Sequence, residues 1–95
     1  MPTTVGLLHL EVQLPQAQSL KDKRRSIKSF KDKMAHGYNV SIAEVDRLDS
    51  VRWGVLAVAA VGNDKTFLEG TLQRIVNAAT AYRDMILMGH EIQWL

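Results

Sequence analysis

The amino-acid sequence predicts an α+β fold whose elements follow the order β-α-β-β-α-β. Three observations lead to this prediction. Apolar and polar side chains alternate along residues 5–14, as in a strand with one buried face. Residues 20–37 and 65–85 repeat apolar side chains at helical spacing, and residues 52–61 are apolar on both faces, as in a central strand. The order is that of the ferredoxin-like fold, in which two helices cover one face of a four-stranded antiparallel sheet.

The first strand is expected to end at Pro15, and the helix that follows is expected to begin behind Ser19. A serine there can accept a hydrogen bond from a free backbone amide, and Asp22 suits the positive end of the helix dipole. Gly37 can supply the left-handed residue that often ends a helix. The core-facing side chains of these two elements are Leu8, Leu10, Val12 and Leu14 of the strand and Leu20, Ile27, Phe30 and Met34 of the helix.

The second half of the chain is expected to contain two strands, a helix and a last strand. β-branched residues recur along residues 39–46, where Ala43 and Glu44 interrupt the alternation in a way that fits a bulge. Asn63 and Asp64 can cap the second helix. The apolar face of that helix comprises Phe67, Leu68, Leu72, Ile75, Val76, Ala79 and Ile86, and the last strand covers residues 90–95.

Length and composition limit what the chain can be. With 95 residues and a mass of 10.7 kDa, residues 1–95 are expected to form one domain with a modest core. The absence of cysteine excludes disulfides, thiolate nucleophiles and Cys-based zinc sites. We see neither an export signal nor the ~20 apolar residues that a membrane span needs, so the expected location is the cytoplasm, with no membrane partner.

The charge of the chain is concentrated in the first helix. Residues 19–36 contain seven Lys and Arg side chains and two Asp, a net charge of +5, in a chain whose formal net charge is +2. The remainder is therefore slightly acidic, at −3. A basic element on an acidic body is typical of a protein that meets polyanions through one face.

Three segments also resemble a known family. They are "SLKDKRR" at the start of the first helix, "YNVSIAEVD" along the second strand and "VLAVAAVGND" leading into the second helix. The chain resembles the YlxP-like family of small bacterial proteins of unknown function over nearly its whole length. The resemblance implies a ferredoxin-like fold. It also implies a role near the ribosome, because genes of this family often lie in operons with translation initiation factor two and ribosome-binding factor A. It brings no set of catalytic residues.

The first helix is therefore the candidate binding element. On a helical wheel some cations point outward and others flank the apolar stripe. We expect them to contact phosphates of ribosomal RNA or of a ribosomal subunit, although an ordinary solvated basic surface stays an open alternative. Bases are not expected to stack on the sheet, where Trp53 is the only aromatic of the first and third strands. The candidate phosphate-binding residues are Lys21, Arg24, Arg25, Lys28 and Lys31.

Lys23 falls inside the apolar stripe of the same helix. An isolated buried ammonium is too costly, so its side chain must either extend past the edge of the sheet or pair with an acid. Glu44 and Glu11 are the two candidate partners.

No pattern in the sequence identifies an enzyme. An acylphosphatase-like enzyme of this fold would need a phosphate-cradling loop after the first strand, rich in backbone amides and carrying an arginine, but here the loop is residues 15–19, which contain no glycine. The acids Glu44, Asp46 and Asp49 lack a partner base and are expected to form ion pairs with cations such as Lys23, Arg24 or Arg52. We therefore expect a protein without enzymatic activity.

The histidines do not form a recognisable metal motif. His9 and His90 could approach each other if the first and last strands pair, but a third ligand would have to be Glu11 or Glu91. His36 suits the carboxyl end of its helix. We expect no metal and no other cofactor.

The face of the sheet away from the helices is expected to be apolar. A patch of that size on a small protein is usually covered, so we expect a homodimer that packs through this face or through edge strands. A register shift by one residue would exchange the two faces, and this alternative stays open. The candidate contact residues are Leu7, Val55, Ala57 and Ala59, with Val61 beside them and Trp94 on a terminal edge strand.

Overall fold

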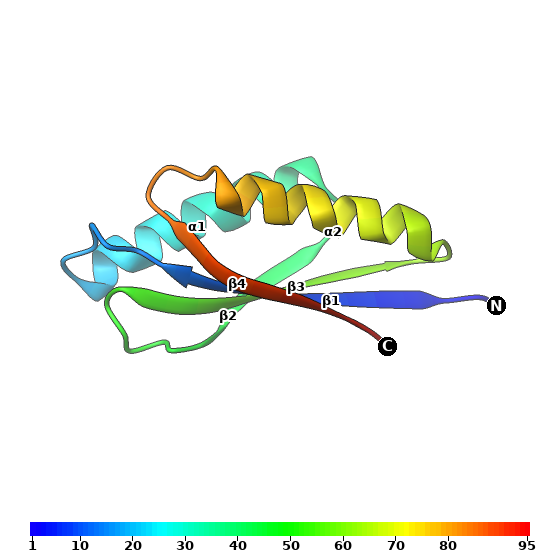
Figure 1. The fold of residues 1–95 in the computed structure, drawn as a ribbon, viewed down its shortest axis with the longest axis horizontal. Helices are drawn as coiled ribbons and strands as arrows, with labels where there is room; N and C mark the ends of the chain where they lie inside the picture. Colours follow the sequence, from blue (N-terminus) through cyan, green and yellow to red (C-terminus); the bar gives the residue numbers. More distant parts are fainter.

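In the computed structural model, which describes residues 1–95, two helices lie on one face of a four-stranded sheet (Figure 1). The strand order is β2-β3-β1-β4 and all three pairings are antiparallel, so the ferredoxin-like prediction is confirmed. The elements are β1 (Thr4–Gln13), α1 (Leu20–Gly37), β2 (Ser41–Asp46), β3 (Trp53–Gly62), α2 (Lys65–Thr80) and β4 (Ile86–Trp94).

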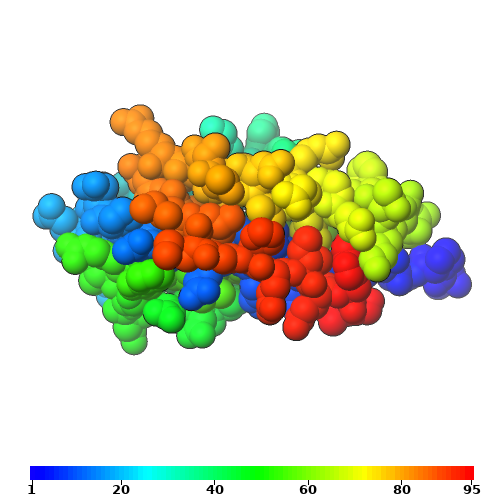
Figure 2. All heavy atoms as spheres, viewed as in Figure 1, coloured from blue at the N-terminus to red at the C-terminus, as the bar shows by residue number.

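The core lies between the sheet and the helices. Alternate side chains of the central strands β1 and β3 point toward the helices and are fully buried, as their two-residue periodicity requires. Figure 2 shows α2 and β4 packed side by side along one surface of the molecule. The largest fully buried apolar residues of the core are Leu8, Leu10, Val12, Leu14, Phe30, Leu56, Val58, Leu72 and Ile75.

Side-chain caps begin both helices, as the sequence predicts. The Ser19 hydroxyl accepts a hydrogen bond from the backbone N–H of Asp22 at 3.1 Å, and the Asp22 carboxylate accepts one from the N–H of Gln18 at 3.0 Å. Asp64 accepts hydrogen bonds from the N–H groups of Thr66 (3.0 Å) and Phe67 (3.3 Å). These acceptors satisfy amides that have no partner within a helix.

The boundary between α2 and β4 differs from the prediction. The helix ends at Thr80 rather than at residue 85, and β4 begins at Ile86 rather than at residue 90. Ile86 therefore does not belong to the apolar face of α2; it pairs with Gln13 of β1 and its side chain is 47% exposed. The reason is tertiary, because pairing with β1 makes β4 begin already at Ile86. In addition, Tyr82 of the intervening turn packs edge-on against Phe30, with ring centroids 5.2 Å apart.

Two smaller expectations also need correction. Gly37 is the last residue of α1, but no glycine in the structure has a positive φ, so it does not supply a left-handed cap. The second strand begins at Ser41 instead of residue 39. A bulge does interrupt its pairing with β3, between Glu44 and Asp46, close to the predicted place.

Lys23 is fully buried, at 0% exposure, and its charge is satisfied from several directions. Its Nζ lies 2.9 Å from a carboxylate oxygen of Glu44 and donates hydrogen bonds to the carbonyls of Arg47 (2.9 Å) and Trp53 (3.0 Å), with that of Leu48 farther away at 3.4 Å. Of the two predicted partners, Glu44 is correct. Glu11 lies instead near Arg47, at 3.9 Å. The ammonium joins the first turns of α1 to the connection between β2 and β3.

We expect Lys23→Met to lower the free energy of unfolding by about 3–5 kcal/mol, because Glu44 and two carbonyls would lose their cationic partner while staying largely shielded from water. Urea unfolding followed by tryptophan fluorescence measures this loss. Lys28→Met is the control, since it removes only an exposed pair with Asp32 and is expected to cost less than about 0.5 kcal/mol. Similar losses in the two variants would contradict this account.

Gly6 and Gly37 are expected to respond to alanine in opposite directions. A Cβ at Gly6 would lie 2.7 Å from the Trp94 ring and 2.9 Å from Leu72, whereas a Cβ at Gly37 would meet no atom within 4 Å. We expect Gly6→Ala to destabilise the fold by about 1–3 kcal/mol. Gly37→Ala should stabilise it by up to about 1 kcal/mol, because it restricts the unfolded chain. Thermal unfolding of both variants checks the signs, and a neutral Gly6→Ala would argue against the packing of Trp94 on β1.

Candidate functional site

The outer surface of α1 carries the predicted cations, and we call it the basic face of α1. Lys21, Arg24, Arg25 and Lys28 are exposed, and Lys31 is partly buried. Lys28 forms an ion pair with Asp32 at 2.6 Å, while the other four make no ion pair. Their donors are therefore available to an outside anion. From Lys21 to Lys31 the helix rises about 15 Å, which spans several successive phosphates of one nucleic-acid strand.

The orientation of this face follows from the residues beneath it. Ile27, Phe30 and Met34 are buried against the sheet, and Lys23 lies in the same stripe. At 100° per residue, Lys21 and Arg25 are each about 160° from Lys23 around the helix axis. Burial of Lys23 thus turns these two cations toward solvent.

The acids proposed as ion-pair partners behave differently from one another. Glu44 pairs with Lys23, as expected, but Asp46 accepts a hydrogen bond from the backbone N–H of Arg47 at 2.7 Å and forms no ion pair. Asp49 forms none either. Arg52 has a structural part, since its Nε donates a hydrogen bond to the carbonyl of Ala17 at 3.0 Å.

The face of the sheet without helices is the open face, and the structure places the predicted apolar residues on it. The register sets Leu7 opposite Ala59, and Ala57 opposite His9. These side chains and that of Val55 are only partly buried, because no helix covers this side (Figure 1). The alternative of a register shifted by one residue is therefore wrong.

Trp94 does not share the open face with the other predicted contact residues. It belongs to the edge strand β4, as expected, but pairs with Gly6 and packs against the core on the helix side of the sheet. The Nζ of Lys65, from α2, lies 5.2 Å from the centroid of a Trp94 ring. Trp94 thus anchors the end of β4 beneath α2, since the register assigns it to the covered side.

One end of the open face is polar. Glu11, Asp46, Arg47 and Glu91 line a shallow hollow there, together with His9, whose Nδ1 is buried without a hydrogen-bond partner. The register pairs His9 with Glu91 but His90 with Leu10, so the two histidine side chains point to opposite faces of the sheet, although His90 also borders the hollow. Histidine and carboxylate side chains do not gather in groups of three that could hold a metal ion.

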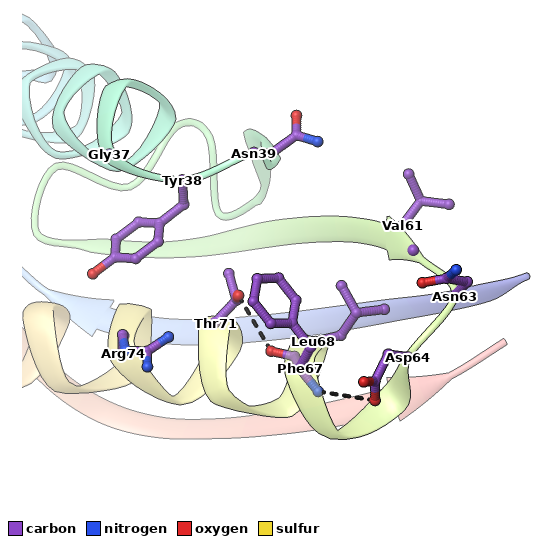
Figure 3. A pocket seen from close by; sticks show the side chains of 11 residues that line it. Gly37, Tyr38, Asn39, Val61, Asn63, Asp64, Phe67, Leu68, Thr71 and Arg74 are labelled. Atoms are coloured by element: carbon purple, nitrogen blue, oxygen red, sulfur yellow. Dashed lines mark hydrogen bonds between the residues drawn. The ribbon is translucent and has the colours of Figure 1, made fainter.

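A cleft of about 550 Å³ opens where the end of α1 meets the start of α2, and we call it the α1–α2 cleft (Figure 3). The sequence pattern does not reveal this cleft, because it predicts Phe67 on the apolar face of α2, whereas the side chain is 68% exposed. A signal existed, since Phe67 lies about 100° from Leu68 on the helical wheel, near the border of the buried stripe. The lining residues are Gly37, Tyr38, Asn39, Val61, Gly62, Asn63, Asp64, Phe67, Leu68, Thr71 and Arg74.

Neither helix has the length and apolar character needed to cross a membrane.

Comparison with known proteins gives a family and a fold. The family model described as "Protein of unknown function (DUF503)" matches residues 5–92. The uncharacterized protein YlxP of Bacillus subtilis (strain 168) is 31% identical over 72 residues, which cover 76% of this chain and 78% of that protein.

Two solved structures share the fold at low sequence identity. The de novo designed protein Foldit4 has a TM-score of 0.59 at 18% identity, with 98% of this chain and 96% of the design covered. A C-terminal segment of the alpha subunit of aIF2 from Pyrococcus abyssi has a TM-score of 0.53 at 16% identity, with 100% of this chain and 51% of that one covered. At these identities the likeness is one of fold alone.

Proposed function

The chain belongs to the DUF503 family, and on this premise we propose that it is a non-enzymatic accessory protein of translation or ribosome maturation that binds ribosomal RNA through the basic face of α1. The ribosome is the proposed setting because of the operons that the resemblance to YlxP-like proteins implies. The family description itself assigns no activity.

The observation that carries this proposal is the row of unpaired cations on α1. Arg24 and Arg25 are exposed and engaged with no acid, so both guanidinium groups can form paired hydrogen bonds to phosphate oxygens. Lys21 extends the same surface toward the start of the helix. None of these three side chains supports the core, so all three are free to contact an outside partner.

Binding through a helix also agrees with the surface of the sheet. Stacking of bases on the open face would need exposed aromatic rings, but the guanidinium of Arg47 already lies 5.6 Å from the ring centroid of Trp53. The acids at the polar end of that face would repel phosphates. A basic helix lying against structured RNA predicts a preference for shape more than for sequence.

Exchange of two arginines tests this proposal. We expect Arg24→Gln/Arg25→Gln to weaken co-sedimentation with bacterial ribosomal subunits. The slope of log affinity against log salt concentration should become less steep by about 1.4–1.8, because each lost phosphate contact removes about 0.7–0.9 from it. Lys65→Glu on α2 is the matched control, because it changes the net charge by the same amount away from α1. Equal effects of the two changes would mean that only net charge matters, and no association of the wild type at low salt would refute the proposal.

A second candidate function rests on the open face: a small homodimeric module for protein interaction or regulation. Strands of nine or ten residues at ~3.3 Å per residue, set ~4.8 Å apart, give this face roughly 500 Å² in projection. Because side chains stand out from the sheet, the accessible area of this face is larger than its projection and comes close to the ~800 Å² that each partner buries in a standard interface. The apolar half around Leu7, Ala57 and Ala59 would form the centre of the contact, and the acids would lie at its rim.

We expect Leu7→Lys to convert a dimer into a monomer, because two copies of the ammonium would be brought into an apolar contact. Light scattering after size-exclusion chromatography measures the mass of each species. Gln73→Lys, on the exposed side of α2, is the control and should stay dimeric. A wild-type protein that remains a monomer at high concentration would exclude the homodimer, and circular dichroism verifies that both variants fold.

A further inference from the structure

Phe67 is the only aromatic residue among the strongly exposed large apolar side chains, at 68% exposure. Single exposed apolar residues are ordinary. Phe67, however, lines the α1–α2 cleft together with the half-buried ring of Tyr38 and the guanidinium of Arg74 (Figure 3). The cleft thus offers a flat apolar surface with polar groups on several sides of it.

Several polar groups around this opening have no partner within the protein. Arg74 forms no ion pair or hydrogen bond, and its guanidinium turns back along α2, since a Cβ on Gly70 would lie 3.8 Å from one of its nitrogens. The side-chain amides of Asn39 and Asn63 and the hydroxyl of Tyr38 also make no hydrogen bond in the structure. Both hydrogen-bond donors and hydrogen-bond acceptors are therefore available to a ligand.

The charges in the cleft indicate which part of a nucleotide it suits. Asp64 caps α2 through the amides of Thr66 and Phe67, so its carboxylate occupies the place where a phosphate would otherwise bind. Arg74 is the single cation among the lining residues. A neutral planar group with donors and acceptors on its edge fits better than a phosphate.

The cleft is also continuous with α1. Gly37, the last residue of that helix, lines the cleft, and from Lys21 to Gly37 the helix rises about 24 Å. Around the helix axis, at 100° per residue, Gly37 lies about 120–180° from the cations of the basic face, so a nucleic-acid strand held by these cations would have to cross the end of α1 to bring a base into the cleft.

We propose that the α1–α2 cleft binds an unpaired nucleobase of an RNA, with Phe67 stacking on the base and with Arg74 contacting its polar edge. The identity of the ligand as RNA rests on the function proposed for the basic face of α1. The site adds what that face lacks, namely a way to distinguish an RNA with a free base from a bare chain of phosphates. Stacking on a single ring is expected to contribute about fivefold in affinity.

The test compares two probes that carry the same number of phosphates: a single-stranded RNA decamer and a decamer of the same length in which every base is missing. Fluorescence anisotropy measures both affinities at one salt concentration. The wild type should bind the RNA at least about fivefold more tightly than the abasic probe. Phe67→Ala should remove that difference, Phe67→Trp should keep it, and Met88→Ala, an exposed apolar residue of β4, should leave it unchanged.

The outcomes separate this proposal from the proposed function. Equal binding of both probes by the wild type would be consistent with phosphate binding by the basic face of α1 and would overturn the proposed base site in the cleft. If neither probe binds, the phosphate proposal fails, and the cleft is tested alone by adding adenosine and uridine to ¹⁵N-labelled protein. Amide shifts confined to Tyr38, Asn39, Phe67 and Thr71 would then support the base site, and their absence would overturn it.

Discussion

The buried ammonium of Lys23 is the interaction on which the arrangement of this molecule depends. A charged group at 0% exposure is tolerated only because Glu44 and the carbonyls of Arg47 and Trp53 surround it. These partners come from β2, from the turn that follows it and from the start of β3. One side chain therefore links the first turns of α1 to the hairpin at the edge of the sheet, and it sets the rotation of α1 that points Lys21 and Arg25 away from the protein.

The two sides of the sheet differ in covering and in charge, and the proposals follow this difference. On the helix side, the solvent-exposed surface includes the basic face of α1. The open face is apolar at one end and carries Glu11, Asp46 and Glu91 at the other. RNA bound on α1 and a second copy bound on the open face would occupy opposite sides. A dimer formed through the open faces would then present two basic helices outward, so the two proposed functions are compatible.

The fold also occurs in a designed protein and in a segment of aIF2, and a fold of this kind does not by itself indicate an activity. The features of this chain that point to a partner lie on its surface: the unpaired cations of α1 and the cleft lined by Phe67 and Arg74. The stability of the fold requires neither, because these side chains make few contacts with the core. Surface residues of this kind carry most of the information about a partner.

The sequence by itself determined the order of the elements, both helix caps and the position of the basic face, and it limited the open face to two registers that differ by one residue. These features depend on residues a few positions apart, through periodicity and local hydrogen bonds, so they can be inferred without a structure. It also reduced the partner of Lys23 to two acids, because a buried ammonium needs one.

Only the tertiary structure decided that Glu44 is the acid that pairs with Lys23 and where α2 ends and β4 begins. It also decided on which side of the sheet Trp94 lies and that Phe67 faces a cleft. Each of these depends on the register between distant strands or on the docking of one element against another. The ladder between β1 and β4 draws Ile86 into a strand and assigns Trp94 to the covered side. Pairings of this kind are set by the free energy of the whole sheet and its core, which no local stretch of the sequence contains.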